Sequence, residues 1–422
     1  MHELLATTLA NLEKRRVKVV EGGVNSIPSE LIRFSNAYIG TEQKKFYLIS
    51  AGTKAGKTQI GSYLKIYTPI LFAYFNPSKV RVKIKYYAWE ETAEEILERF
   101  MCFILNKMSK GAIRIAPIDL KSSRSNTPVN LLILNTLNSK EYLDILSFFV
   151  SSIEFSYTGN PTGVLKECEA YMKSIGTIEY DKIEIKDGFG NTSTSQKFKK
   201  YVQNDPDLYV ILFVDHISLI SPEKGETLKQ AIDKLSDYCI KELRNKYGMT
   251  IVIIQQQSAD QEGSDNFKTG LMRPSVNGLA DSKYTSRNCN MFLGIFSPFR
   301  MKLEQYLGYD IRVFMDNIRF VEVVLNRGGS SGDIVPLYFD GAVCEFIELP
   351  NSKDSHLIAA VYEKLKQIRN RNVTPKEKLF LAISIKSMTL GARLHLLKNK
   401  LKNKWQIAVS SLAKQGQENQ QV

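Results

Sequence analysis

The stretch Phe46-Tyr47-Leu48-Ile49-Ser50-Ala51-Gly52-Thr53-Lys54-Ala55-Gly56-Lys57-Thr58-Gln59 decides the fold. It begins with a short apolar run, passes through small residues and ends in Gly-Lys-Thr before a segment that has the residue types of a helix. This order predicts a strand, a phosphate-binding loop and a helix. Small residues let consecutive backbone N–H groups turn toward phosphate oxygens, and the following helix adds its positive end. We therefore expect an ATP site here.

The loop residues have distinct expected roles. Lys57 would reach the terminal phosphates, and the Thr58 hydroxyl would hold Mg²⁺. One position departs from the general pattern, because Ala51 stands where that pattern has Gly. The alternative is a glycine-rich turn between a strand and a helix, without a ligand. The residues expected to contact the nucleotide are Ala51, Gly52, Thr53, Lys54, Ala55, Gly56, Lys57 and Thr58.

The composition is that of a globular protein whose surface must carry a positive field. The 422 residues are 43% hydrophobic and 24% charged, which allows one large domain with extensions. A net charge of +13 suits a polyanion such as nucleic acid better than an acidic small substrate. The five cysteines have no paired spacing, which disfavours a disulfide framework or a zinc site. Since there is no membrane-spanning run and no signal peptide, we expect a cytoplasmic protein without a membrane partner.

Three regions are predicted along the chain. Residues 1–25 form a linker helix, in which Leu5, Leu9 and Leu12 share one face; that face would pack on its own domain or on a neighbouring subunit. Residues 26–350 form the core domain. Residues 351–422 form a basic extension with a polar, disordered end. Its spaced cations between 376 and 404 would add non-specific DNA affinity, or else form a solvated face or a protein contact.

Strand and helix patterns alternate through the core domain. This alternation predicts an α/β fold with a mainly parallel central sheet flanked by helices. Region 109–206 should add further α/β elements in an order that the sequence does not give, with a polar loop at 188–195. The other predicted elements are helices at 57–75 and 226–247, a helix carrying Ile96, Leu97, Phe100 and Ile104, strands at 80–87, 208–214 and 249–254, and a hairpin from 319–325 to 334–339.

Two acidic residues follow predicted strands. Asp215 ends an apolar strand, where a carboxylate opposite Thr58 would bind the metal; the alternative is an aspartate that caps a loop. Glu90 ends the strand that we expect beside the phosphate strand, and it would orient the attacking water. Glu91 is the competitor for this role. Either glutamate could instead be an acid in the first turn of a helix, which the helix dipole favours.

Gln256 and Arg327 are further candidates. Gln256 lies at the tip of its strand and could hydrogen-bond the γ-phosphate, although a polar strand end alone would explain it. Arg327 lies in a glycine-rich hairpin, from which an arginine can be offered to the nucleotide of a neighbouring subunit. The alternative for Arg327 is a solvated turn residue.

Together these segments resemble the DnaB-type replicative helicases, and most of all the phage versions. The resemblance covers residues 26–350 and implies a RecA-like ATPase core, a homo-hexameric ring with ATP at its subunit interfaces, and single-stranded DNA in the channel. It also implies 5′ to 3′ movement, in a bacterial cytoplasm or a phage-infected cell. The matching segments are the phosphate loop 51–58, Trp89-Glu90-Glu91, Leu212-Phe213-Val214-Asp215-His216-Ile217-Ser218-Leu219-Ile220, the strand tip at Gln256, and Arg327-Gly328-Gly329-Ser330-Ser331-Gly332.

The resemblance implies a role for each candidate. Lys57 and Thr58 bind phosphate and metal, Glu90 is the catalytic base, Asp215 is the metal-side acid, Gln256 is the γ-phosphate sensor, and Arg327 is a finger supplied in trans. The DNA loop of the family falls on residues 275–283, where Asn277, Gly278, Ser282 and Lys283 could meet the DNA backbone.

Two departures from the family pattern are visible. Leu325 stands where the family commonly has a lysine, two residues before the finger. The family's N-terminal domain has no counterpart before the leading helix, so contacts with a primase or a helicase loader through that domain cannot be carried over.

The leading hypothesis is an ATP-driven helicase that translocates on single-stranded DNA. One alternative is a RecA-like recombination ATPase that binds single strands without unwinding. The other is a DNA-binding accessory protein with a decayed nucleotide site.

Overall fold

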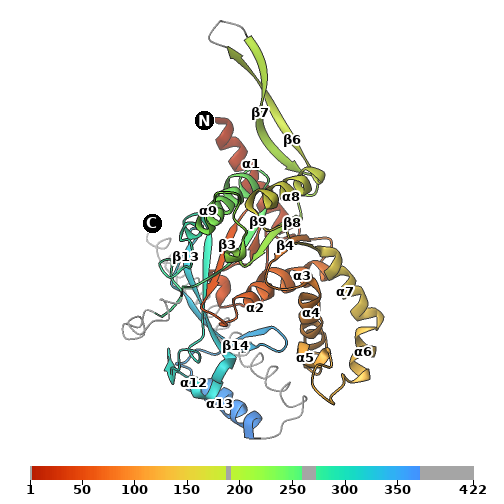
Figure 1. Ribbon diagram of the computed structural model, residues 1–422, viewed down its shortest axis with the longest axis vertical. Coiled ribbons are helices and arrows are strands. Elements are labelled where there is room, and N and C mark those ends of the chain that lie inside the picture. Colours follow the sequence, from red (N-terminus) through yellow and green to blue (C-terminus); the bar gives the residue numbers. More distant parts are fainter. Residues whose placement is uncertain (1, 187–191, 259–271, 371–422) are drawn as a thin grey trace, which may run out of the picture.

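A twisted sheet forms the centre of the computed structural model, which describes residues 2–186, 192–258 and 272–370 (Figure 1). In this described part, nine strands pair in the order β15-β14-β13-β10-β3-β9-β8-β4-β5. From β10 to β5 the neighbours are parallel, while β13, β14 and β15 extend the sheet in antiparallel fashion. The strands are β3 (Phe46–Ala51), β4 (Arg81–Ala88), β5 (Ile153–Ser156), β8 (Leu208–Asp215), β9 (Thr250–Gln256), β10 (Met291–Phe296), β13 (Ile318–Asn326), β14 (Ile334–Asp340) and β15 (Glu345–Glu348).

Helices cover both faces of the sheet, which confirms the predicted α/β class. All six residues of β3 are buried, as expected for a central strand with helices on both sides. One hydrophobic cluster joins the sheet to the helices that follow the phosphate loop, and a second joins its other face to α8 and α9. The covering helices are α2 (Lys57–Ser62) and α3 (Thr68–Phe75), joined by a π-helical turn (Tyr63–Tyr67), then α4 (Ala93–Met108), α7 (Lys140–Ser152), α8 (Pro161–Ser174) and α9 (Leu228–Tyr238), the last continued by a π-helical turn (Cys239–Arg244).

Strand β4 does not lie beside the phosphate strand β3, so that expectation was wrong. Strands β9 and β8 separate the two, and β4 pairs with β8 on one side and β5 on the other. Strand order depends on how the helical crossovers fold back onto the sheet, and the local pattern of one strand does not contain it.

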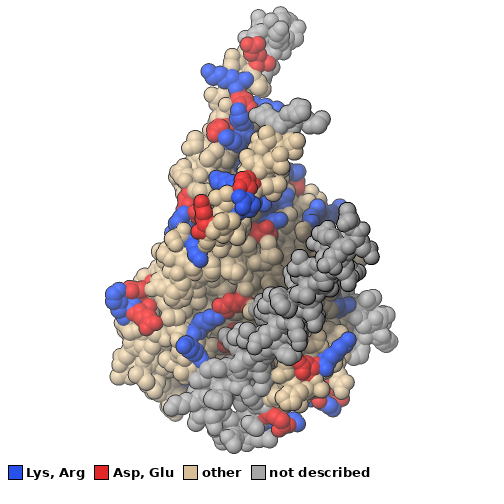
Figure 2. Space-filling view, turned by 180° about the vertical axis from the view of Figure 1, so that it is seen from behind, with Lys and Arg blue, Asp and Glu red and all other residues tan. Residues whose placement is uncertain are grey.

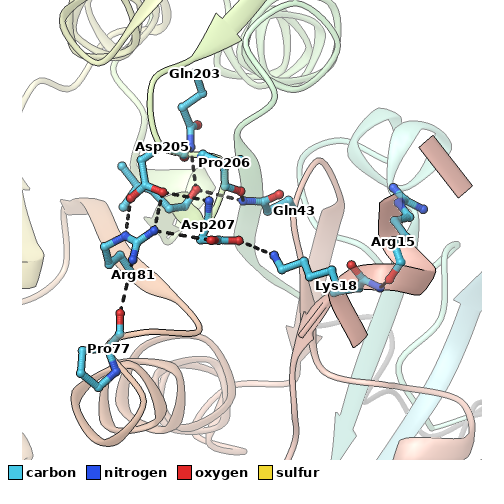
Figure 3. Close-up of polar contacts among 11 residues, drawn as sticks. Arg15, Lys18, Gln43, Pro77, Arg81, Gln203, Asp205, Pro206 and Asp207 are labelled. Atoms are coloured by element: carbon cyan, nitrogen blue, oxygen red, sulfur yellow. Dashed lines mark hydrogen bonds and ion pairs between the residues drawn. The ribbon is translucent and has the colours of Figure 1, made fainter. Parts of the chain in front are cut away.

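The cations of β4 are satisfied in three different ways. Lys83 is exposed and donates to the Ser151 carbonyl, whereas Lys85 is buried and pairs with Glu154. Arg81 pairs with the carboxylate of Asp205 (Figure 3). The alternation of cations with apolar residues therefore marks a strand near the sheet edge, where polar partners are available.

The described part of region 109–206 contains a two-stranded hairpin that the sequence did not predict. Strands β6 (Gly176–Lys186) and β7 (Thr192–Gln203) project from one end of the body (Figure 1). The predicted polar loop at 188–195 was partly wrong, because Thr192 to Ser195 belong to β7. In β6, Ile178 and Tyr180 and then Ile183 and Ile185 alternate with polar residues, which is a strand signal, whereas the pairing of β6 with β7 is a contact that this pattern does not specify. Basic and acidic side chains lie side by side at this end, as in the pairs of Lys200 with Glu179 and of Lys199 with Asp181 (Figure 2).

The two ends of the described chain differ in how they pack. Helix α1 (His2–Val20) lies within the predicted segment 1–25 and leaves Leu5 58%, Leu9 57% and Leu12 56% exposed. Lys18 near its end contacts Asp207 (Figure 3). In contrast, α13 (Ser355–Asn370) buries Ile358, Val361 and Leu365 in a third hydrophobic cluster with residues of β13 and β15. A helix that packs on the core domain therefore follows the boundary proposed at residue 350.

Short elements complete the described chain. None of its helices is long and apolar enough to cross a membrane. The basic segment 376–404 lies outside the described residues. The short elements are β1 (Ser26–Ile27), β2 (Thr41–Glu42), α5 (Pro117–Leu120), α6 (Leu131–Leu137), α11 (Tyr284–Asn288), β11 (Gln305–Tyr306), β12 (Tyr309–Asp310) and α12 (Ile311–Phe314), with 3-10 turns at Phe34–Asn36, Ile217–Leu219 and Met315–Asn317.

Candidate nucleotide-binding site

The phosphate loop connects the end of β3 to the start of α2. Lys54 and Gly56 both have positive φ, 59° and 97°, which turns successive peptide N–H groups toward one side of the loop. Such a concave arrangement of N–H groups binds anions. Lys57 is the first residue of α2, so its ammonium and the start of the helix add positive charge at the same place.

Asp215 lies opposite Thr58, as predicted. The Thr58 hydroxyl donates to Asp215 Oδ1 at 3.2 Å, and the Tyr86 hydroxyl lies 3.5 Å from Asp215 Oδ2. Hydroxyl and carboxylate oxygens are the ligands that Mg²⁺ prefers. The described residues form no cluster of three or more His, Cys, Asp or Glu side chains that could hold a metal. A cation here would thus need phosphate and water oxygens as well, which is the usual way in which Mg²⁺ is bound beside a nucleotide.

The electrostatics of Asp215 also favour a cation. Burial raises the pKa of this carboxyl to about 7, and the nearby Glu91 carboxylate adds to the shift, while Lys57 opposes it. A buried carboxylate without full charge compensation is costly in the nucleotide-free protein. A divalent ion beside Thr58 would remove that cost.

We predict that Asp215→Asn stabilises the nucleotide-free protein at neutral pH. The pKa of Asp215 is near 3.8 in the unfolded chain and about 7 in the folded protein. Between these two pH values the unfolded state loses the proton more readily, so the free energy of unfolding falls as the pH rises from 3.8 to about 7. The free energy of unfolding of the wild type should fall relative to the variant by on the order of 2–4 kcal/mol over this range. Urea denaturation at several pH values would measure it, with Asp144→Asn as an exposed control. Parallel stability profiles for wild type and Asp215→Asn would contradict the expectation.

The structure separates the two glutamates that follow β4. Glu91 makes a two-pronged ion pair with Arg99 and is 16% exposed. Glu90 is 45% exposed, and its Oε2 lies 3.9 Å from Lys57 Nζ. Of these two glutamates, only Glu90 thus has a carboxylate that lies near Lys57. It reaches this place although β9 and β8 lie between β3 and β4, because Thr58 of α2 contacts the end of β8, which neighbours β4.

His216 is a site residue for which the sequence suggested no role. Its Nε2 lies 3.8 Å from Glu90 Oε2, and burial followed by the nearby Lys57 lowers its pKa, which keeps the ring neutral at neutral pH. Its position directly after Asp215 is the only sequence signal, and it does not reveal a contact with Glu90.

Gln256 lies at the phosphate-loop edge of the sheet. It pairs in register with Ala51, the residue at which β3 gives way to the loop. The flanking glutamines hold nearby segments: Gln255 donates to the carbonyls of Ala280 and Ser282, and Gln257 donates to Ser50 Oγ at 2.7 Å. The Gln256 carbonyl accepts from the amide of Ala280 at 3.0 Å, so Gln256 itself connects the loop end of the sheet to the segment around Ala280.

Arg327 and the phosphate loop of the same chain lie at opposite ends of the strands of the sheet. Arg327 follows β13, whose last residue pairs with Met291, which in turn pairs with Tyr47 near the start of β3. The loop begins at the other end of β3, roughly 15–20 Å away at the usual rise per strand residue. Arg327 is exposed and donates to the Arg287 carbonyl. Leu325, which replaces the family's lysine, packs against the second hydrophobic cluster.

The four predicted DNA-contacting residues lie in two different environments. Asn277 and Lys283 are exposed, whereas Gly278 and Ser282 are buried. The Ser282 hydroxyl is held by Asp233, and the Gly278 carbonyl accepts from the amide of Ser258. Only Asn277 and Lys283 present side chains to solvent in this conformation.

Comparison with known proteins places the fold. Neither a protein-family model nor a curated protein matches the sequence. The structure of the ATPase domain of G40P matches with a TM-score of 0.55 and 15% identity, over 83% of this chain and 98% of that one. A structure described as that of a DnaB-like replicative helicase and its interactions with primase matches with a TM-score of 0.53 and 16% identity, over 83% of this chain and 68% of that one. The chain therefore has the RecA-like α/β fold of DnaB-type helicases.

Proposed function

We propose that the chain is an ATP-dependent DNA helicase that moves along single-stranded DNA, 5′ to 3′, as a homo-hexameric ring. The observation that carries this proposal is the meeting of Lys57, Thr58, Asp215 and Glu90 around the phosphate loop, in a fold shared with a DnaB-like helicase. The compartment that goes with it is the cytoplasm of a bacterium or of a phage-infected cell.

Each side chain has a task in ATP hydrolysis. The loop N–H groups and Lys57 bind the phosphates, and Glu90 orients the attacking water and accepts its proton. Thr58 and Asp215 would hold Mg²⁺, which supplies positive charge on the phosphate oxygens when it is bound. Gln256 would hydrogen-bond the γ-phosphate and respond to its loss through the segment after β9.

Two observations support assembly into a ring. Arg327 is too far from the phosphate loop of its own subunit to contribute there, so it would serve the nucleotide of a neighbour. Helix α1 leaves a row of leucines exposed, which favours the second of its two predicted packing partners, a neighbouring subunit. The hexameric number comes from the family resemblance.

DNA would bind through the segment that follows β9 and through the positive surface field. Asn277 and Lys283 are exposed and could contact phosphates, and residues 259–271 of the same segment lie outside the described residues. Gly278 and Ser282 would need this segment to rearrange before they contact DNA. A primase or a helicase loader is proposed as a further partner.

A strand-displacement assay tests this function. We expect ATP-dependent release of the paired strand from a forked duplex with a free 5′ tail, and no release by Lys57→Ala. DNA-stimulated ATP hydrolysis without strand release would favour the recombination ATPase. DNA binding with nucleotide turnover that Lys57→Ala leaves unchanged would favour the accessory protein.

A further inference from the structure

A buried arginine on β13, Arg319, holds the backbone of the phosphate loop by a hydrogen bond. Arg319 Nε donates to the Ala55 carbonyl at 2.7 Å. Arg319 is the second residue of β13, and its side chain is 2% exposed. This contact joins residues that are 264 positions apart in the chain.

The guanidinium of Arg319 is fixed on every side. Its Nη1 donates to the carbonyls of Asp316 and Ile318, both at 2.8 Å, and its Nη2 donates to Asp316 Oδ1 at 3.0 Å. Its central carbon, Cζ, lies 4.6 Å from the centre of the Phe339 ring. These contacts fix the position of the guanidinium, so the Ala55 carbonyl must point toward it to keep its hydrogen bond.

The contact with Ala55 sets the direction of a neighbouring N–H group. In a trans peptide, the C=O of one residue and the N–H of the next lie in one plane and point in opposite directions. Because Arg319 holds the Ala55 carbonyl toward the protein interior, the Gly56 N–H must point away from Arg319, toward the anion-binding side. Rotation of this peptide would turn a carbonyl oxygen toward the phosphates, where it would repel them.

We propose that Arg319 is a positioning residue for the phosphate loop, and that it acts by locking the Ala55–Gly56 peptide in the orientation that binds the triphosphate. The inference rests on the proposed ATP site and goes beyond it, because Arg319 itself need not contact the nucleotide. The sequence showed only an arginine at the start of an apolar strand, and the role arises from a contact between distant segments.

The test measures the affinity of ATP and of inorganic tripolyphosphate for Arg319→Lys. Lysine keeps the positive charge but loses the planar fork that makes these contacts together. Both ligands should bind on the order of 10-fold more weakly, since one backbone hydrogen bond to a charged group is compromised. Tripolyphosphate has no base or sugar, so it reports on the loop alone. The thermal midpoint of each variant shows whether it is folded.

Arg114→Lys is the matched control. Arg114 makes a two-pronged pair with Asp340 at the end of β14, and no contact of this pair involves the phosphate loop. It should lower stability without changing the affinity for either ligand. Asp316→Asn is a second test variant, because it weakens the hold on the guanidinium and leaves the Ala55 contact in place. Asp316→Asn should weaken the binding of both ligands by a smaller factor than Arg319→Lys. If Arg319→Lys does not fold, the affinities of Asp316→Asn decide the question.

Two results would overturn the inference. If Arg319→Lys weakened ATP but not tripolyphosphate, Arg319 would serve the base or the sugar. If folded Arg319→Lys and Asp316→Asn bound both ligands like the wild type, the lock would have no effect. Lys57→Ala separates these failures from failure of the ATP site itself, because a Lys57→Ala protein that binds tripolyphosphate normally would refute the site.

Discussion

Replacement of Arg327 by alanine is expected to lower ATP turnover by about 10³–10⁵-fold, the range measured for arginine fingers in other phosphate-transferring enzymes. The reason is positional. Arg327 lies beside the start of β3, whereas the phosphate loop of the same chain follows its end. An arginine there can neutralise charge on the transferring phosphate only if a neighbouring subunit presents its loop. Nucleotide affinity should change far less than turnover, since the finger acts mainly in the transition state.

Mixing two inactive proteins tests the position of the finger directly. Arg327→Ala subunits keep an intact phosphate loop, and Lys57→Ala subunits keep an intact finger. In random equimolar rings, roughly one interface in four combines the intact halves, so part of the ATPase activity should return. Arg244→Ala is the control. Arg244 lies close enough to Arg327 for their charges to interact, but its side chain bonds to Asn290 of the same subunit, so this variant should keep its ATP turnover. No recovery at any mixing ratio would contradict a finger supplied in trans, and a fully active Arg327→Ala protein would remove the finger altogether.

Replacement of Glu90 by glutamine is expected to lower kcat by about 10²–10⁴-fold, with the KM for ATP nearly unchanged. Glutamine keeps the size and the hydrogen-bonding capacity of the side chain but cannot accept the proton of the attacking water. The carboxylate lies beside Lys57 and His216, which are both close to the phosphate loop. Single-turnover measurements with bound ATP would isolate the chemical step.

Glu91→Gln is the matched control, one residue further along. This variant would leave Arg99 without its carboxylate partner, so we expect a lower thermal midpoint rather than a slow chemical step. A severe loss of kcat in Glu91→Gln at unchanged stability, with Glu90→Gln active, would assign the base to Glu91 instead.

Several features could be predicted because their signal is local. The glycine-rich loop between an apolar run and a helix fixes φ angles, N–H directions and the place of Lys57 within a few consecutive residues. Asp215 was predictable because an apolar strand that ends in a carboxylate belongs to the same parallel sheet, whose strand ends meet at one edge. The alternation of strands and helices gave the α/β class for the same reason.

Other features depend on which segments pack together. The order that separates β4 from β3 follows from the crossovers, and it was predicted wrongly. The choice between Glu90 and Glu91 depends on Arg99, which holds the Glu91 carboxylate in an ion pair, while the Glu90 carboxylate lies near Lys57. The hairpin β6–β7 depends on the pairing of two segments, which the apolar residues of β6 alone do not specify.

The sequence by itself determined the α/β class, the glycine-rich loop between β3 and α2 and the acid that lies opposite Thr58, since each depends on neighbouring residues or on a repeated pattern. Only the tertiary structure decided that Arg319 holds the loop from β13, that His216 lies beside Glu90, and that Arg327 lies at the far end of the sheet. These three facts join segments distant in the chain, and such contacts are set by how strands order and pack rather than by local preference.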